Sequence, residues 1–124
     1  MSDNTYTNFL FEADRLRMIL IDKIDIDRII KANYLDLGMY KDAVVNFEGY
    51  CKDTRINMVG KPSLKAQKMI IAKINIRESN SAVAKINSSI EINLFLEDKS
   101  KIYIYNSPDV IIEGIRDNAE IVKR

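Results

Sequence analysis

Apolar residues follow two different patterns along the chain, and the pattern changes near residue 60. Before that point they recur at mixed steps that favour helix, and after it they alternate strictly with polar residues, which favours strand. The sequence therefore predicts an α+β fold, with N-terminal helices packed on one face of an antiparallel β-meander of three to five strands. We expect a single domain over residues 1–124, with a mainly helical part at 1–51 and an antiparallel sheet part at 62–124.

Two helices are predicted in the N-terminal part. The first runs from about Asn4 to Ile21, and the second starts at Asp25 or Asp27 and ends at Leu37, before a possible left-handed cap at Gly38. Carboxylates at the start of the second helix would meet its unpaired amides and the positive end of its dipole. The apolar stripe of the first helix consists of Phe9, Leu10, Ala13, Leu16, Leu20 and Ile24.

Residues 39–51 fit two interpretations. A strand would place Ala43, Val45 and Phe47 on one face, whereas a helix would align Tyr40, Ala43, Val44, Phe47 and Tyr50. We favour the helix slightly. The residues Tyr34, Gly38, Tyr40, Ala43 and Phe47 resemble half of a tetratricopeptide hairpin, which implies two helices packed closely at the glycine. The resemblance covers residues 34–47 without a second copy, and no family is identified across the chain.

The C-terminal half alternates with period 2. Its apolar residues occupy even positions, at Leu64, Ala66, Ile70, Ala72, Ile74, Ile76, Ala82, Ala84, Ile86, Ile90, Ile92, Leu94, Leu96, Ile102 and Ile104. This pattern predicts strands with one buried face. Polar clusters at 78–81, 98–100 and 106–109 predict short hairpin connections, hence an antiparallel meander. Residues 110–122 could add a short strand, a bend at Gly114 and a final strand.

Composition excludes several kinds of chemistry. The chain has 19 basic and 18 acidic residues, no histidine and a single cysteine, so histidine triads, histidine or cysteine zinc sites and disulfide frameworks cannot form within it. We expect no enzymatic activity, no cofactor and no metal.

The apolar runs are too short to cross a bilayer, and the N-terminus lacks signal-peptide features. The sequence therefore predicts a cytoplasmic location, in the host cytoplasm if the source is viral.

Two groups of residues could carry chemistry, but each has a simpler structural explanation. Asp22, Asp25 and Asp27 could bind a divalent cation, yet their spacing fits no calcium loop and helix capping explains them. Cys51 lies near Lys52 in the sequence, and a cationic neighbour can activate a thiolate. Without a histidine to pair with it, we expect a buried or inert thiol.

A basic stretch from Lys52 to Lys73 carries six basic residues against Asp53 alone, although the whole chain has a net charge of +1. Such a stretch could contact phosphates or steer an acidic partner. In the predicted sheet, lysine and tyrosine side chains would share the odd-numbered face, which is typical of platforms that bind single-stranded nucleic acid. The candidate contacts are Lys61, Lys65, Lys73, Lys101, Tyr103 and Tyr105.

Apolar residues outside the predicted core exceed what one small monomer can bury. They are Phe9, Phe11, Met18, Ile19, Ile21, Met39, Met58, Met69, Ile71 and Phe95. Apolar surface of this kind usually marks contact with another protein. The leading hypothesis is therefore a protein–protein interaction or assembly protein, a small oligomerising subunit, adaptor or chaperone of a larger complex such as a phage or secretion machine. We expect a homo-oligomer or a stable protein partner, with Phe9, Phe11, Met18 and Ile19 in the contact; nucleic-acid binding is the alternative.

Overall fold

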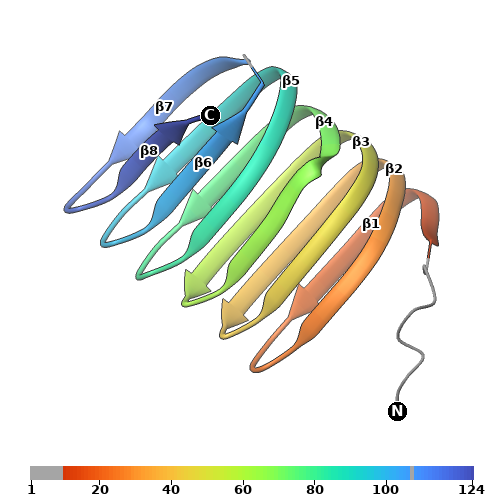
Figure 1. Ribbon diagram of the computed structural model, residues 1–124, viewed down its shortest axis with the longest axis horizontal. Helices are drawn as coiled ribbons and strands as arrows, with labels where there is room; N and C mark the ends of the chain where they lie inside the picture. The colour runs from red at the N-terminus through yellow and green to blue at the C-terminus, as the bar shows by residue number, and fades with distance from the viewer. Residues whose placement is uncertain (1–9, 107) are drawn as a thin grey trace.

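Eight strands wind into a spiral, and helix is absent from residues 10–106 and 108–124, the part of the chain that this computed structural model describes (Figure 1). In chain order the strands are β1 (Leu10–Leu20), β2 (Asp25–Lys41), β3 (Val44–Gly60), β4 (Ser63–Glu78), β5 (Val83–Leu96), β6 (Lys101–Tyr105), β7 (Asp109–Ile115) and β8 (Glu120–Lys123). Every pair of neighbours is parallel, in the order β1-β2-β3-β4-β5-β6-β8, with β7 also paired to β5.

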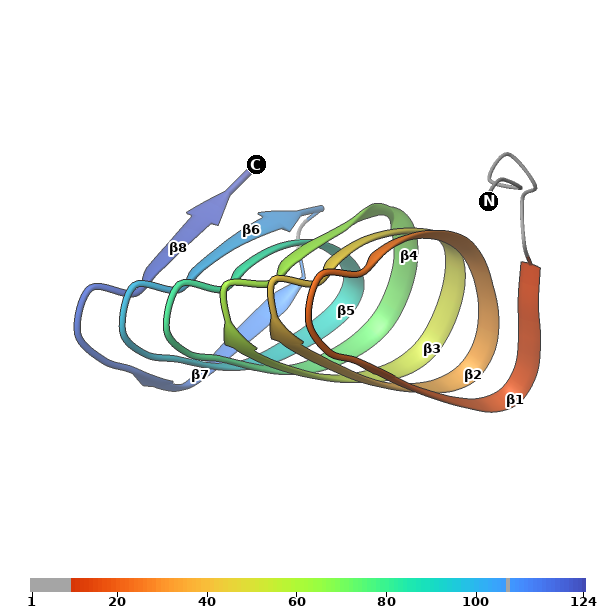
Figure 2. The same cartoon turned by 90° about the horizontal axis from the view of Figure 1, so that it is seen from below.

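Each long strand bends back on itself, so that one strand makes most of one turn of the spiral (Figure 2). Its neighbour is the corresponding strand of the next turn: Asp25 pairs with Val44, nineteen positions later, and Val44 pairs with Ser63. The fold is therefore a parallel β-solenoid, in which each coil packs chiefly on the coil before it and the coil after it.

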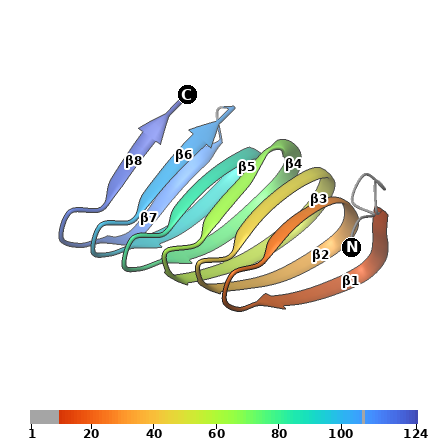
Figure 3. The same ribbon diagram turned by 60° about the horizontal axis from the view of Figure 1, so that its bottom comes forward.

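The bend divides the coils into two walls (Figure 3). The fifth strand makes the division plain, because its first half pairs with β6 and its second half with β7. Wall A contains residues 10–12, 25–31, 44–50, 63–70, 83–87, 101–105 and 120–123. Wall B contains residues 15–20, 34–40, 53–59, 73–78, 91–96 and 109–115.

A tight corner connects wall B of one coil to wall A of the next. The residue at the corner has a left-handed backbone, with φ between 62° and 101°, at Asp22, Lys41, Gly60, Asn80, Asp98 and Asp117. Asp, Asn and Gly adopt this conformation most readily. Lys41 is the one corner residue of another type. Its side chain forms an ion pair with the preceding corner, where Lys41 Nζ lies 3.1 Å from the Asp22 carboxylate. Backbone hydrogen bonds continue from coil to coil here, as from Lys61 N–H to Lys41 O at 2.8 Å.

The core consists of columns of side chains that run along the spiral axis between the walls. In wall A, one column contains the buried residues Val45, Leu64, Ala84 and Ile102. In wall B, another contains the buried residues Leu37, Ile56, Ile76 and Leu94. Because a coil adds one member to each column, the alternation of every strand must agree in phase with that of its neighbours.

The predicted α+β fold is wrong. The second predicted helix is strand β2, and residues 10–20 of the first form β1, while its residues 4–9 lie outside the described part of the chain. Residues 39–51 belong mainly to β2 and β3, so the strand alternative for that segment is correct and the resemblance to a tetratricopeptide hairpin has no structural counterpart. The bend explains the error. Ile26 and Ile30 point inward before it and Leu35 and Leu37 after it, so alternation changes phase and imitates helical spacing.

The antiparallel meander is also wrong, although strands occupy most of its predicted positions. The polar clusters at 78–81 and 98–100 are corners that lead into the opposite wall, and they do not return the chain beside the strand it has just left. Most of the predicted even positions are buried, but Ile70 and Ile90 are exposed. At Ile70 the phase of alternation changes, so that Met69 and Ile71 are buried instead.

Candidate binding surface

The outward side chains of wall B form columns of polar and charged groups. One column contains Tyr34, Asp53, Lys73 and Glu91, the second contains Asp36, Arg55, Asn75 and Asn93, and the third contains Asn57, Arg77 and Phe95. We call these residues the ladder face. Their spacing from coil to coil equals the distance between hydrogen-bonded strands, about 4.8 Å, so a rigid backbone sets their positions.

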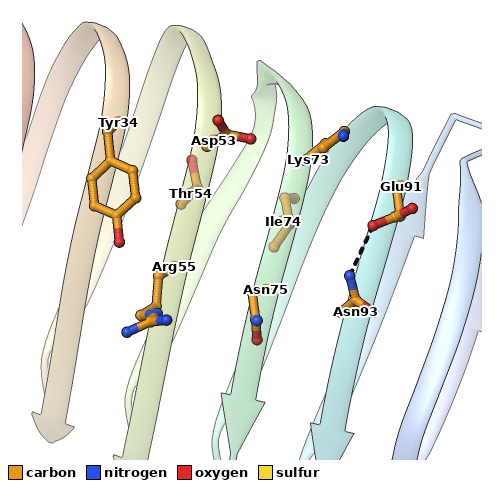
Figure 4. Close-up of a pocket in the computed structure, with 9 residues that line it drawn as sticks. All are labelled: Tyr34, Asp53, Thr54, Arg55, Lys73, Ile74, Asn75, Glu91 and Asn93. Atoms are coloured by element: carbon orange, nitrogen blue, oxygen red, sulfur yellow. Dashed lines mark hydrogen bonds between the residues drawn. The ribbon is translucent and has the colours of Figure 1, made fainter.

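A shallow depression lies at the centre of the ladder face (Figure 4). Tyr34, Asp53, Arg55, Lys73, Asn75, Glu91 and Asn93 line it, together with Thr54 and Ile74. Within it, Asn93 Nδ2 donates a hydrogen bond of 2.9 Å to Glu91 Oε2. Two further depressions continue along the same face, one beside Arg55 and Arg77 and one beside Arg77 and Phe95.

Arginine and aromatic side chains stack at both ends of the ladder face. The Arg77 guanidinium carbon lies 5.1 Å from the centre of the Phe95 ring, and that of Arg116 lies 5.5 Å from it. Gly114 is next to Phe95 in the register, and a Cβ there would come within 2.8 Å of the ring. At the opposite end, Arg15 lies over Tyr34 at 5.5 Å. These contacts hold the planar groups in defined orientations.

The ladder face offers many hydrogen-bond donors and acceptors of both charges and no enclosed cavity. In the described residues, no group of three or more His, Cys, Asp or Glu side chains is arranged to hold a metal ion. The arrangement suits recognition of a polar partner surface, because guanidinium, amide and carboxylate groups impose geometric specificity on hydrogen bonds.

Glu78 is the unusual residue of the interior. It is 1% exposed, it lies in a wall B column between Met58 and Leu96, and neither carboxylate oxygen has a hydrogen-bond partner among the described residues. Burial without a partner raises the pKa of this carboxyl well above its ordinary value, because desolvation penalises the charged form.

Cys51 is buried and free, which confirms the prediction of a buried thiol. Its Sγ donates to the backbone oxygen of Asp53 at 3.1 Å. Burial is the largest influence on the thiol and raises its pKa. The reactive thiolate therefore forms less readily than in an exposed cysteine.

The predicted partner-binding residues lie at the start of the chain. Phe9 is outside the described residues. Phe11 and Met18 are half-buried in β1, and Ile19 is 54% exposed on the outer side of the same strand. Four residues assigned to the apolar surplus, Met39, Met58, Met69 and Ile71, are instead in the core.

The candidate nucleic-acid contacts are divided among different faces. Lys73 is in wall B and Lys61 is at a corner, whereas Lys65, Lys101, Tyr103 and Tyr105 lie together in wall A. Lys65, Lys85 and Tyr103 are consecutive in one wall A column, where Lys85 Nζ lies 5.8 Å from the centre of the Tyr103 ring. The single odd-numbered face assumed from the sequence therefore does not exist.

The aspartates considered as cation ligands have other roles. Asp22 is a corner residue paired with Lys41, and Asp25 and Asp27 lie on the outer side of wall A. Helix capping is excluded as their explanation, since the segment is a strand.

The sequence did not reveal the ladder face, because Tyr34 fell in a predicted helix and Asp53 was considered only as the one acidic residue of the basic stretch. The signal that could have revealed it is the spacing of the corner residues, which recur every eighteen to twenty positions from Asp22 to Asp117. A period in this range is typical of a solenoid.

Comparisons with known proteins give one match. A family model described as "Putative auto-transporter adhesin, head GIN domain" matches residues 6–108. No curated protein matches, and no solved structure matches. The search of the described residues for a helix able to span a membrane found none.

Proposed function

This chain belongs to the auto-transporter adhesin head GIN domain family, and we propose that it is a non-enzymatic adhesion module that binds a protein partner through the ladder face. The family supports a role in protein interaction. The observation that carries the proposal is the ladder face itself, in which three adjacent depressions are lined by charged and amide side chains.

The physical basis is that the parallel coils fix the binding groups before a partner arrives. Arg55, Asn75 and Asn93 project from paired strands in adjacent coils, so little backbone freedom is lost on binding. Arginine contributes strongly to protein interfaces because it combines charge, several donors and a planar surface.

The test uses beads that carry the purified domain and cells with protease-treated or untreated surfaces. We expect adhesion to untreated cells, its loss after protease treatment, and at least a tenfold reduction for Arg55→Glu combined with Arg77→Glu. The matched control is Lys65→Glu combined with Lys85→Glu, which makes an equal charge change in wall A. Absence of adhesion, or equal losses in both double variants, would refute the role of the ladder face.

Self-association is the second part of the proposal. It rests on apolar side chains at the two ends of the solenoid, where Ile19 and Ile21 in the first coil and Ile111, Ile112 and Ile115 in the last are exposed. Light scattering over a concentration series tests it, and a constant monomer mass at high concentration would contradict it.

Single-stranded nucleic-acid binding is the alternative function, and the cluster of Lys65, Lys85 and Tyr103 in wall A favours it. It predicts salt-sensitive binding of an oligonucleotide that is lost in Tyr103→Ala combined with Tyr105→Ala. No binding at about 50 mM salt would eliminate this alternative.

The sequence predicts the cytoplasm, whereas the family description fits a surface position. We propose surface exposure on this basis, and protease accessibility of the protein on intact cells tests it.

A further inference from the structure

The last coil of the solenoid ends in an open strand edge. Strand β7 pairs with β5 on one side, and no described strand pairs with its other side. Ile112 and Ile115 belong to interior columns of wall B, yet they are 53% and 42% exposed, because no coil among the described residues covers them. Solenoids normally shield such an end with a polar cap, since an uncovered edge invites pairing with another chain.

The first coil presents the complementary edge. Strand β1 pairs with β2 on one side, and its other side has no partner strand among the described residues. The interior columns that end at Val110 and Ile112 begin at Leu16 and Met18 of this strand. Because every coil repeats the same cross-section, the end of one molecule matches the beginning of another.

From this match we propose that the chains stack end to end, with β7 of one copy pairing in parallel with β1 of a second copy. The proposal deepens the self-association proposed above by specifying the partner, the two strands and their register. Extending each column by one coil places Val110 beside Leu16 of the second copy, Ile112 beside its Met18 and Ile115 beside its Leu20. The exposed Ile112 and Ile115 and the half-buried Leu16 and Met18 then become interior members of continuous columns.

One charged column of wall B supports the same register, whereas in wall A the stacking places Glu120 opposite Asp25 of the second copy. The first column of the ladder face, which contains Tyr34, Asp53, Lys73 and Glu91, is extended by Arg15 at the start of the solenoid and by Asp109 at its end. Stacking in this register places Asp109 opposite Arg15 of the second copy, which continues the column with an opposite-charge pair. At the last corner, Asp117 of the first copy would face Asp22 of the second copy. In the second copy Asp22 already has a cationic partner, since its carboxylate lies 3.1 Å from Lys41 Nζ.

The contact joins two different surfaces, so it does not close into a symmetric dimer. A head-to-tail contact of this type generates rings or filaments, according to the rotation between copies. The coils within one chain follow each other along an axis without closing (Figure 1), and the same operation between copies produces a linear filament.

The test is a charge exchange, measured by sedimentation velocity of the full chain over a concentration series at low salt. Asp109→Arg and Arg15→Asp alone should each weaken association about tenfold, since an attraction becomes a repulsion. The chain that carries both changes should recover the association of the unchanged protein, because the opposite-charge pair is restored with its polarity reversed. Ile112→Lys combined with Ile115→Lys should abolish association and leave far-ultraviolet circular dichroism unchanged, because both side chains lie on the open end.

Three outcomes overturn the proposal: a monomer at every concentration, association that the single charge changes leave intact, or failure of the double change to restore it. The second and third results would retain self-association and reject this register, whereas the first would reject both. Bead adhesion by the Ile112→Lys, Ile115→Lys chain is expected to persist, because the ladder face is intact. Its measurement separates failure of stacking from failure of the adhesion proposal.

Discussion

Replacement of Glu78 by methionine is expected to stabilise the protein. Glu78 occupies an interior column between Met58 and Leu96, and both of its carboxylate oxygens are buried without a hydrogen-bond partner. An unpaired buried polar group costs about 1–3 kcal/mol. Methionine has a similar volume and already occurs in the column, so it removes this cost without overpacking. We expect the free energy of unfolding to increase by about 2 kcal/mol where the carboxyl is neutral in both states, and by more at neutral pH.

The same substitution should change how stability depends on pH. The folded-state pKa of Glu78 is raised above its ordinary value of 4.5, so below that value the carboxyl is neutral in both states and carries no titration penalty. As pH rises, the unfolded chain releases the proton first, and the free energy of unfolding falls by up to about 1.4 kcal/mol per pH unit until the folded-state pKa is reached. Glu78→Met and Glu78→Gln should both remove this slope.

Urea denaturation followed by far-ultraviolet circular dichroism at several pH values measures both effects. Glu48→Gln, on the exposed side of β3, is the matched control and should leave the slope unchanged. Equal or lower stability of Glu78→Met throughout pH 5–8, or the same pH slope in that variant as in the unchanged protein, would show that the buried carboxyl carries no penalty.

Other positions give predictions that the same measurements can check. Ile74→Asp or Ile92→Asp should prevent folding, because each puts a charge into a buried column, and native-like circular dichroism would contradict this. Gly49→Ala should lower the free energy of unfolding by roughly 1–3 kcal/mol, since φ is 118° and the added Cβ would collide with neighbouring backbone. Gly38→Ala, which meets only a flexible side chain, should cost less. Cys51 should react with a thiol reagent in urea but not in the native protein, and fast native reaction would refute its burial.

Prediction from the sequence succeeded where alternation was continuous. Ile74, Ile76, Ile92 and Leu94 were expected in the core and are buried there. It failed at the bends, where the phase of alternation changes, and Ile70 was expected inside but is half exposed. In β2 the same phase change produced helical spacing, which led to the wrong fold class.

The candidate site depended almost entirely on the tertiary structure. Tyr34, Asp53 and Glu91 lie in three different strands, and only the register of the coils puts them in one column. The reverse applies to Lys73 and Tyr103, which share odd numbers but lie in opposite walls. Whether a residue number is odd or even tells which side of its own strand the side chain is on. It does not tell whether that strand segment belongs to wall A or to wall B.

The sequence by itself determined the absence of histidine chemistry and of disulfides, the strands of the C-terminal half and most of their buried positions. The direction of pairing, the two walls, the open ends and the burial of Glu78 were decided by the tertiary structure. The physical reason is that parallel and antiparallel strands alternate with the same period. What distinguishes them is whether a corner returns the chain beside itself or directs it into the next wall. That choice depends on how successive coils stack, and corner residues such as Asp22 and Asn80 do not specify it individually.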